Sequence, residues 1–183
     1  NISYKCLLMT LTFDKYKKLF ITVGTTRFDL LCHSIQSPQV LAALKKLGCK
    51  EITFQIGNSD VEPGVFEKEG IKMNLYRFKD SIKQDMCDAD LVISHAGAGS
   101  CIEALDANKP LLVVVNEELM DNHQLELADQ LQVDGHLYYC TCDTLVNTLE
   151  TVDFKWLSPM PKPSPNAFVK FLDSVFIVNK KGQ

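Results

Sequence analysis

Short apolar runs and longer amphipathic stretches alternate along most of this chain. Compact apolar runs at 19–23, 91–94 and 111–115 predict buried strands, and the last two suit parallel strands that are covered on both faces. Residues 51–56 alternate between apolar and polar positions and stop at Gly57, which predicts another strand. Further strands are predicted at 72–78 and 137–140.

The stretches between these strands have the spacing of helices. One helical pattern starts at Phe28, is interrupted near Ser37-Pro38 and resumes as far as Leu47, with Pro38 as an early position of the second helix. The other predicted helices are 81–88, 99–107, 121–133, 143–149 and a last one from about residue 166. We expect 58–70 to be a surface loop and 158–165 a proline-rich linker. This alternation predicts an α/β fold with a doubly wound, mostly parallel Rossmann-like sheet.

Length and composition fit one domain with a core of its own. The chain has 183 residues, of which 46% are hydrophobic. We interpret residues 1–17 as a peripheral N-terminal extension and residues 18–183 as the Rossmann-like domain, which ends in a C-terminal helix. The net charge of −4 argues against nucleic-acid binding.

Cysteine usage and hydropathy bear on the compartment. The seven cysteines lie mostly in apolar runs, and an odd count fits reduced thiols that fill a core. A cytoplasmic location follows. No run reaches the roughly 18 apolar residues that a bilayer crossing needs.

The segment from Leu91 to Leu105 carries the most chemistry. An apolar run ends in Ser94-His95, two glycines bracket Ala98, and a helical pattern begins at once. This order predicts a strand, a tight turn and a helix N-terminus, whose free N–H groups and positive dipole end suit a diphosphate. One turn into the helix, the Glu103 carboxylate can accept hydrogen bonds from ribose hydroxyls. A nucleotide-diphosphate ligand is therefore predicted.

Two more polar segments follow predicted strands. Gly24-Thr25-Thr26 closes the first strand, and Asn116 follows the strand at 111–115. The carboxyl ends of parallel strands share one edge of a sheet, where ligands of such folds bind. Fold and motifs therefore predict one site at that edge.

Other interpretations of these residues stay open at this point. The glycines at 97 and 99 also fit a helix-packing turn without ligand, and His95 also fits a strand-end hydrogen bond to the backbone. A cysteine hydrolase that pairs Cys101 with His95 lacks a third orienting group. A dinucleotide-binding enzyme is disfavoured, because the glycine pattern is too short and follows the fourth strand. The main alternative to an enzyme is a non-catalytic module that binds a nucleotide or a partner.

Three segments together resemble one family. They are 93–100 (ISHAGAGS), 116–124 (NEELMDNHQ) and 23–26 (VGTT). The chain resembles the cytosolic catalytic subunit of the two-subunit UDP-N-acetylglucosamine transferase of dolichol-linked oligosaccharide synthesis. That family is similar to the C-terminal, donor-binding half of two-Rossmann-domain (GT-B) glycosyltransferases.

The resemblance implies an inverting transferase. It adds the second N-acetylglucosamine, β1,4-linked, to N-acetylglucosaminyl-diphosphodolichol at the cytosolic face of the endoplasmic reticulum. The implied partners are UDP-N-acetylglucosamine and a membrane-anchored subunit that binds the lipid acceptor. The C-terminal helix, with its Phe168, Phe171 and Val175 stripe, fits either the core or a contact with that subunit.

Roles for single residues follow from the resemblance. Glu103 is implied for the ribose, and His95 is a candidate general base unless the partner supplies that group. Because helix N-termini stabilise the leaving charge, no metal or cofactor is expected. The implied donor-binding residues are Gly24, Thr25, Thr26, Ala96, Gly97, Ala98, Gly99, Ser100 and Asn116, with Asn122, His123 and Gln124 against the sugar.

Overall fold

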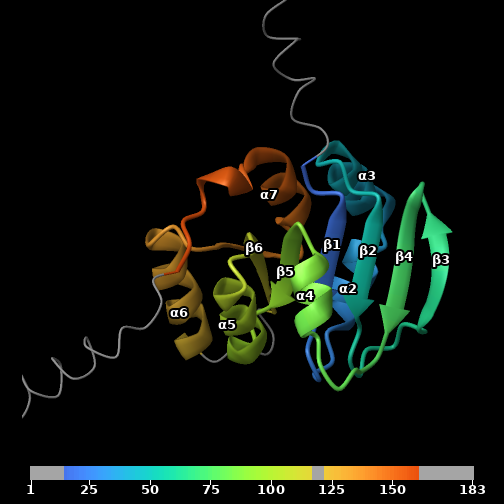
Figure 1. The fold of residues 1–183 in the computed structure, drawn as a ribbon, viewed down its shortest axis with the longest axis horizontal. Coiled ribbons are helices and arrows are strands. Elements are labelled where there is room, and N and C mark those ends of the chain that lie inside the picture. Colours follow the sequence, from blue (N-terminus) through green and yellow to red (C-terminus); the bar gives the residue numbers. More distant parts are fainter. Residues whose placement is uncertain (1–14, 117–121, 161–183) are drawn as a thin grey trace, which may run out of the picture.

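The computed structural model describes residues 15–116 and 122–160 and builds them around one seven-stranded sheet (Figure 1). The strands are β1 (Lys18–Thr22), β2 (Glu51–Gln55), β3 (Gly64–Lys68), β4 (Ile71–Tyr76), β5 (Leu91–His95), β6 (Leu111–Val115) and β7 (Tyr138–Thr141). Their order is β3-β4-β2-β1-β5-β6-β7, and only the β3–β4 pair is antiparallel among the described strands.

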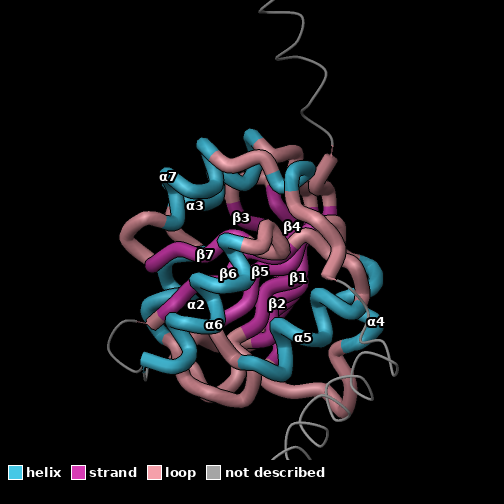
Figure 2. Tube along the Cα trace, turned by 90° about the vertical axis from the view of Figure 1, so that its left-hand side faces the viewer, coloured by secondary structure: helices cyan, strands magenta, loops and turns pink. Residues whose placement is uncertain are grey.

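Helices lie between most of the parallel strands and follow the last one. They are α2 (Asp29–Ile35), α3 (Pro38–Lys46), α4 (Lys83–Asp88), α5 (Ala98–Asp106), α6 (Asn122–Val133), α7 (Leu145–Thr151) and the 3-10 turn η1 (Phe154–Trp156). Figure 2 shows the strands between α3 and α7 on one side and α4 and α5 on the other. Within the described ranges, no helix is long and apolar enough to span a membrane.

Each face of the sheet carries its own apolar core. Successive strand residues point to opposite faces, so Leu19 and Ile21 pack with α2, α3 and α7, whereas Phe20 packs with α4 and α5. All five residues of β6 are buried, as are the first four of β5. Burial on both faces explains why these central strands appear in the sequence as nearly unbroken apolar runs.

The predicted α/β fold is confirmed, and the ends of the predicted elements that the structure describes are shifted by at most two residues. The break between the first two helices lies at Ser37, whose hydroxyl caps α3 by accepting a hydrogen bond from the Val40 N–H at 3.3 Å. Pro38 is the first residue of α3, as predicted. The predicted C-terminal helix lies outside the described residues.

The prediction that 58–70 is only a surface loop is wrong. Residues 64–68 form β3, which pairs with β4 through a tight turn at Glu69 and Gly70. Both turn residues have positive φ, +50° and +75°, as the favoured two-residue hairpin turn requires. Three consecutive residues of β3 are exposed, so no apolar run marks this edge strand in the sequence.

The first described residues lie close to the predicted domain boundary. Lys18 begins β1, but Tyr16 is already buried, with its ring 5.7 Å from that of Phe154 in an edge-to-face contact. The division into an extension and a domain therefore stays a prediction.

The chain order creates a switch point beside β1. After β1 the chain builds β2, β3 and β4 on one side, and it then returns to place β5 on the other side of β1. The connections that leave β1 and β5 diverge above and below the sheet. In open α/β sheets, ligands bind at this point, beyond the carboxyl ends of the strands.

Candidate functional site

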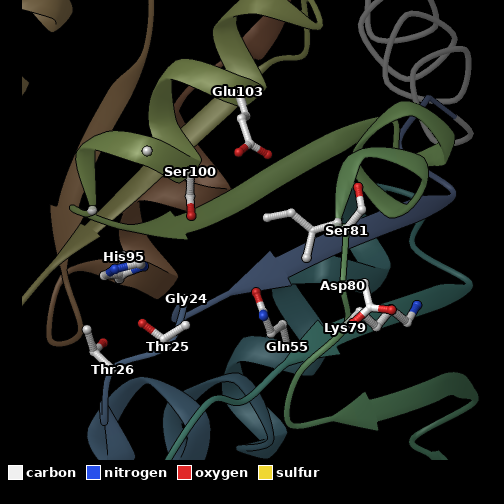
Figure 3. Close-up of a pocket in the computed structure, with 13 residues that line it drawn as sticks. Gly24, Thr25, Thr26, Gln55, Lys79, Asp80, Ser81, His95, Ser100 and Glu103 are labelled. Atoms are coloured by element: carbon white, nitrogen blue, oxygen red, sulfur yellow. The ribbon is translucent and has the colours of Figure 1, made fainter.

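A cavity of about 410 Å³ lies at the switch point between β1 and β5. Figure 3 shows its residues coming from the loops that follow β1, β4 and β5 and from the first turns of α5. The lining residues are Gly24, Thr25, Thr26, Gln55, Lys79, Asp80, Ser81, Ile82, His95, Gly97, Gly99, Ser100 and Glu103. Two of the three segments predicted to meet at one sheet edge, 24–26 and 95–103, line this cavity, and the segment after β6 does not.

The N-terminus of α5 opens into this cavity. Gly97 is its N-cap, and the first intrahelical bond runs from the Cys101 N–H to the Gly97 carbonyl at 3.1 Å. The amides of Ala98, Gly99 and Ser100 therefore belong to the first turn, where an α-helix supplies no acceptor. These amides, together with the positive end of the helix dipole, form an anion-binding arrangement.

His95 lies between two glycines at the base of the cavity. A Cβ on Gly24 would come within 2.7 Å of the His95 Cε1, and a Cβ on Gly97 within 2.6 Å of the same atom. Real Cβ atoms do not approach so closely, so a side chain at either glycine would force the imidazole or the backbone to shift. Burial lowers the pKa of His95, so the ring is neutral at pH 7.

Hydrogen bonds from neighbouring strands shape the loop after β1. The Thr22 hydroxyl donates to the Gln55 Oε1 at 2.7 Å and accepts from the Gly24 N–H at 2.9 Å. Gly24 has a φ of +63°, which L-residues rarely adopt. The Thr26 hydroxyl donates to the Val23 carbonyl at 2.8 Å and closes the turn. This network fixes the loop against β2 at the edge of the cavity.

Two side chains of α5 face the cavity. In Figure 3 the Ser100 hydroxyl and the Glu103 carboxylate point from the helix toward the same space. They are three residues apart, which corresponds to about 4.5 Å along a helix axis. A hydroxyl donor beside the helix N-terminus is thus followed, one turn later, by an acidic acceptor.

Five lining residues were not predicted from the sequence. Gln55 ends β2 and is 5% exposed, and Lys79, Asp80, Ser81 and Ile82 follow β4 and form the opposite wall. Nothing in the types of these residues marks them as site residues. Only their position, at or after the carboxyl ends of strands where ligands bind in such sheets, could have pointed to them. The predicted strand at 72–78 also overran the end of β4 and hid the start of this wall.

Some predicted site residues lie elsewhere or are not described. Ala96 and Ala98 line an adjacent apolar pocket with Cys101 and Ile102 rather than the polar cavity. Asn116 follows β6 at the same edge and is half-buried, but it does not line the cavity. Asn122, His123 and Gln124 begin α6, and their side chains lie outside the described residues.

Cys101 is placed for packing rather than for nucleophilic chemistry. The thiol is buried and donates a weak hydrogen bond to the His95 carbonyl at 3.7 Å. Burial raises its pKa to about 11, so the thiolate is scarce at pH 7. This arrangement argues against a cysteine hydrolase.

Acidic residues of the described chain do not form a metal site at the cavity. One Asp-x-Asp sequence exists, Asp88-Ala89-Asp90, but it precedes β5 and so lies at the opposite edge of the sheet. There the Asp90 carboxylate accepts a hydrogen bond from the Lys18 N–H at 2.9 Å. Among the residues described, no three histidine, cysteine or acidic side chains come together as metal ligands would.

Comparison with known sequences finds glycosyltransferase relatives. The glycosyltransferase family 28 C-terminal domain matches residues 18–175. UDP-N-acetylglucosamine transferase subunit ALG13 of Homo sapiens is 54% identical over 129 residues, which are 70% of this chain and 11% of that protein. The protein of that name from Saccharomyces cerevisiae is 30% identical over 190 residues, covering 85% of this chain and 94% of that protein. This chain thus spans only a small part of the human relative.

Solved structures share this fold. The solution structure of ALG13 superposes with a TM-score of 0.66 at 26% identity and covers 86% of this chain and 96% of that one. MurG of Acinetobacter baumannii superposes with a TM-score of 0.56 at 20% identity, over 82% of this chain and 45% of that one. The second likeness concerns the fold alone. Both agree with the predicted Rossmann-like domain of GT-B type.

Proposed function

The chain belongs to the glycosyltransferase family 28 C-terminal domain family, and from this premise we propose that it binds UDP-N-acetylglucosamine in the cavity between β1 and β5. In this proposal it is the donor-binding catalytic subunit of a glycosyltransferase. The relatives from Homo sapiens and Mus musculus carry the name of a UDP-N-acetylglucosamine transferase subunit, which supports this donor.

One observation carries the proposal: the N-terminus of α5 and the Glu103 carboxylate face one cavity from the same helix. The amides of the first turn and the Ser100 hydroxyl would hold the diphosphate, whose charge the helix dipole favours. One turn further, Glu103 would accept hydrogen bonds from the ribose hydroxyls. The spacing along the helix therefore matches the order of groups in a nucleoside diphosphate.

The same arrangement supports departure of the nucleotide. When the bond between the anomeric carbon and UDP breaks, negative charge grows on the diphosphate oxygen that leaves. Helix amides fixed in place before the reaction stabilise that charge without a metal ion. Inversion then requires attack of the acceptor 4-hydroxyl from the opposite face of the sugar.

A base must take the proton of that hydroxyl. His95 is the candidate in this chain, because it lines the cavity and its lowered pKa keeps the imidazole neutral and able to accept a proton. The close packing of the ring between two glycines also suits a purely positioning role. The other source is the partner subunit.

The acceptor half would be supplied in trans. The described residues form one Rossmann-like unit, whereas GT-B enzymes place the donor and acceptor on two. We propose a membrane-anchored partner that presents the dolichol-linked acceptor at the cytosolic face of the endoplasmic reticulum. The word subunit in the names of the relatives supports a partner.

The deciding experiment measures transfer of labelled N-acetylglucosamine from its UDP form to a short-chain lipid diphosphate acceptor, with and without the partner. Product should form only in the joint sample. Glu103→Gln removes a charged acceptor and should weaken UDP binding roughly tenfold or more. Glu150→Gln is the matched control, since Glu150 pairs with Lys46 on the far side of the fold, away from the cavity.

The outcomes separate the candidate functions. Binding of the UDP-sugar without transfer in either sample would favour a non-catalytic nucleotide-binding module. Absence of UDP-sugar binding in the unaltered chain would contradict both the site and the donor.

A further inference from the structure

The wall of the cavity opposite α5 has little backbone support. Residues 77–82 connect β4 to α4, and Lys79 to Ile82 line the cavity. Within the described chain, the backbone groups of 77–81 make no hydrogen bond to other backbone groups. Backbone hydrogen bonds begin again at both ends of the segment. The Tyr76 carbonyl accepts from the Ile56 N–H at 2.9 Å, and the Ile82 carbonyl accepts from the Met86 N–H at 3.0 Å. The position of the wall therefore depends on side chains.

Three side chains close over this segment, and we name them the Tyr76–Lys79–Asp85 clasp. The Tyr76 hydroxyl donates to the Asp85 Oδ2 at 2.6 Å, and the Lys79 ammonium donates to both Asp85 oxygens at 2.8 Å. The Lys79 Nζ also lies 4.1 Å from the centre of the Tyr76 ring, within the range of a cation–π contact. The clasp ties the end of β4 and the middle of the wall to α4.

Partial burial of the carboxylate distinguishes the clasp from an ion pair in open solvent. The Asp85 side chain is only 16% exposed, and the Lys79 side chain 41%. A carboxylate that accepts three short hydrogen bonds in a partly buried place holds its partners more firmly than one in open solvent.

Arg77, the other cation of this segment, binds the loop after β2 instead. Arg77 turns away from the wall, and its guanidinium donates to the carbonyls of Gly57, Ser59 and Val61. Lys79 is therefore the cation that the wall depends on. In Figure 3 its nitrogen points away from His95 and Ser100, so it does not face the anion-binding end of the cavity.

We propose that the Tyr76–Lys79–Asp85 clasp is a positioning device that sets nucleotide affinity by holding Asp80, Ser81 and Ile82 at a fixed distance from α5. This inference rests on the proposed function, because it concerns the same cavity. Lys79 acts through the position of the wall and not as a counter-ion of the diphosphate. The residue types at 77–82 alone do not predict that the segment is positioned in this way.

Two variants separate the positioning role from a counter-ion role. Asp85→Asn breaks the clasp and releases the Lys79 ammonium, which would then strengthen UDP binding if its charge served the ligand. Lys79→Met breaks the clasp and removes the charge. A positioning device predicts that both variants bind UDP about tenfold more weakly, because a wall displaced by about 1 Å loses its contacts.

The measurement is the dissociation constant of UDP for the full chain by titration calorimetry, beside thermal unfolding of each variant. The double variant should bind no more weakly than the weaker single variant, since both changes disable one device. Lys79→Arg keeps the cation and should retain most of the affinity. Glu150→Gln, which breaks an exposed ion pair elsewhere, should leave the affinity unchanged.

Tighter or unaltered UDP binding by Asp85→Asn would overturn the proposal. So would a lowered unfolding temperature with unchanged affinity, since that result is what a merely structural ion pair gives. If the charge-removing variants do not fold, Tyr76→Phe decides, because it deletes one hydrogen bond and keeps the ring. Failure of the unaltered chain to bind UDP would instead contradict the proposed function.

Discussion

The two walls of the cavity are built from different parts of the polypeptide. On the side of β1 and β5, the wall is shaped mainly by the backbone of two turns, at 24–26 and at the start of α5 (97–100), with the His95 ring between them. On the side of β4 and α4, the wall at 79–82 is held by side chains of the Tyr76–Lys79–Asp85 clasp. The first wall requires glycines, which have no Cβ to meet the His95 ring. The second wall requires the charged side chains of Lys79 and Asp85.

This difference determines how each wall responds to change. In the backbone wall, an added Cβ at Gly24 or Gly97 meets the His95 ring, so the ring or the backbone of the turn has to shift. In the side-chain wall, a substitution removes a tether and leaves the strands and helices in place. Variants of the first wall should therefore lose stability and binding together, and variants of the second should lose binding with smaller changes in stability.

The largest effect is expected for Gly97→Ala. Its new methyl group would overlap the imidazole of His95, and overpacking of this kind costs about 2 kcal/mol of unfolding free energy. Gly99→Ala is the matched control, because a Cβ there meets nothing within 4 Å. Urea unfolding of both variants tests the difference.

Removal of the obstructing ring completes that test. In a background that carries His95→Ala, the Gly97→Ala change should become nearly neutral, since the methyl group then has room. Equal stability of Gly97→Ala and Gly99→Ala would show that the ring yields easily, and the contrast between the two walls would lose its basis.

The backbone wall could be predicted from the sequence, and the side-chain wall could not. Gly97, Gly99 and Ser100 follow an apolar run directly, so local order alone reveals a strand, a turn and a helix N-terminus. Asp85 and Tyr76 are nine residues apart, and their hydrogen bond exists only because α4 folds back beside the end of β4. No local pattern encodes that contact.

The same reasoning applies to the fold. Central strands such as β5 and β6 are buried on both faces and are therefore conspicuous as apolar runs. The edge strand β3 is mostly exposed, so no apolar run marks it. The turn at Glu69-Gly70 can be recognised as a hairpin turn only once β3 is known to pair with β4. Sequence patterns report burial, so they find the centre of a sheet before its edges.

A smaller effect is expected when pH is lowered. Burial lowers the pKa of His95 below the 6.5 of a free imidazole, so the unfolded chain binds a proton that the folded chain does not. The stabilising contribution of the neutral ring is full above pH 6.5 and is lost as pH falls below it. His95→Asn should reduce that dependence, which urea unfolding between pH 8 and pH 5 measures as a difference from the unaltered chain.

The pH dependence tests the backbone wall alone, because His95 lies in that wall and not in the side-chain wall. Glu103→Gln is the control, because it changes the same cavity and leaves the imidazole in place. An identical pH dependence in the unaltered chain and in His95→Asn would mean that the ring is not confined between the two glycines as tightly as the geometry indicates.

The smallest effect is expected for Cys101→Ala, at the back of the same wall. The thiol supports the His95 carbonyl through one long hydrogen bond of 3.7 Å and otherwise packs in the core. Its loss should cost about 1 kcal/mol of stability, with UDP binding and transfer retained. Complete loss of turnover in a folded Cys101→Ala variant would contradict the pKa of about 11 that burial gives the thiol, since it would require a nucleophilic thiolate. Retained turnover would agree with a thiol that packs beneath the wall and takes no part in the chemistry.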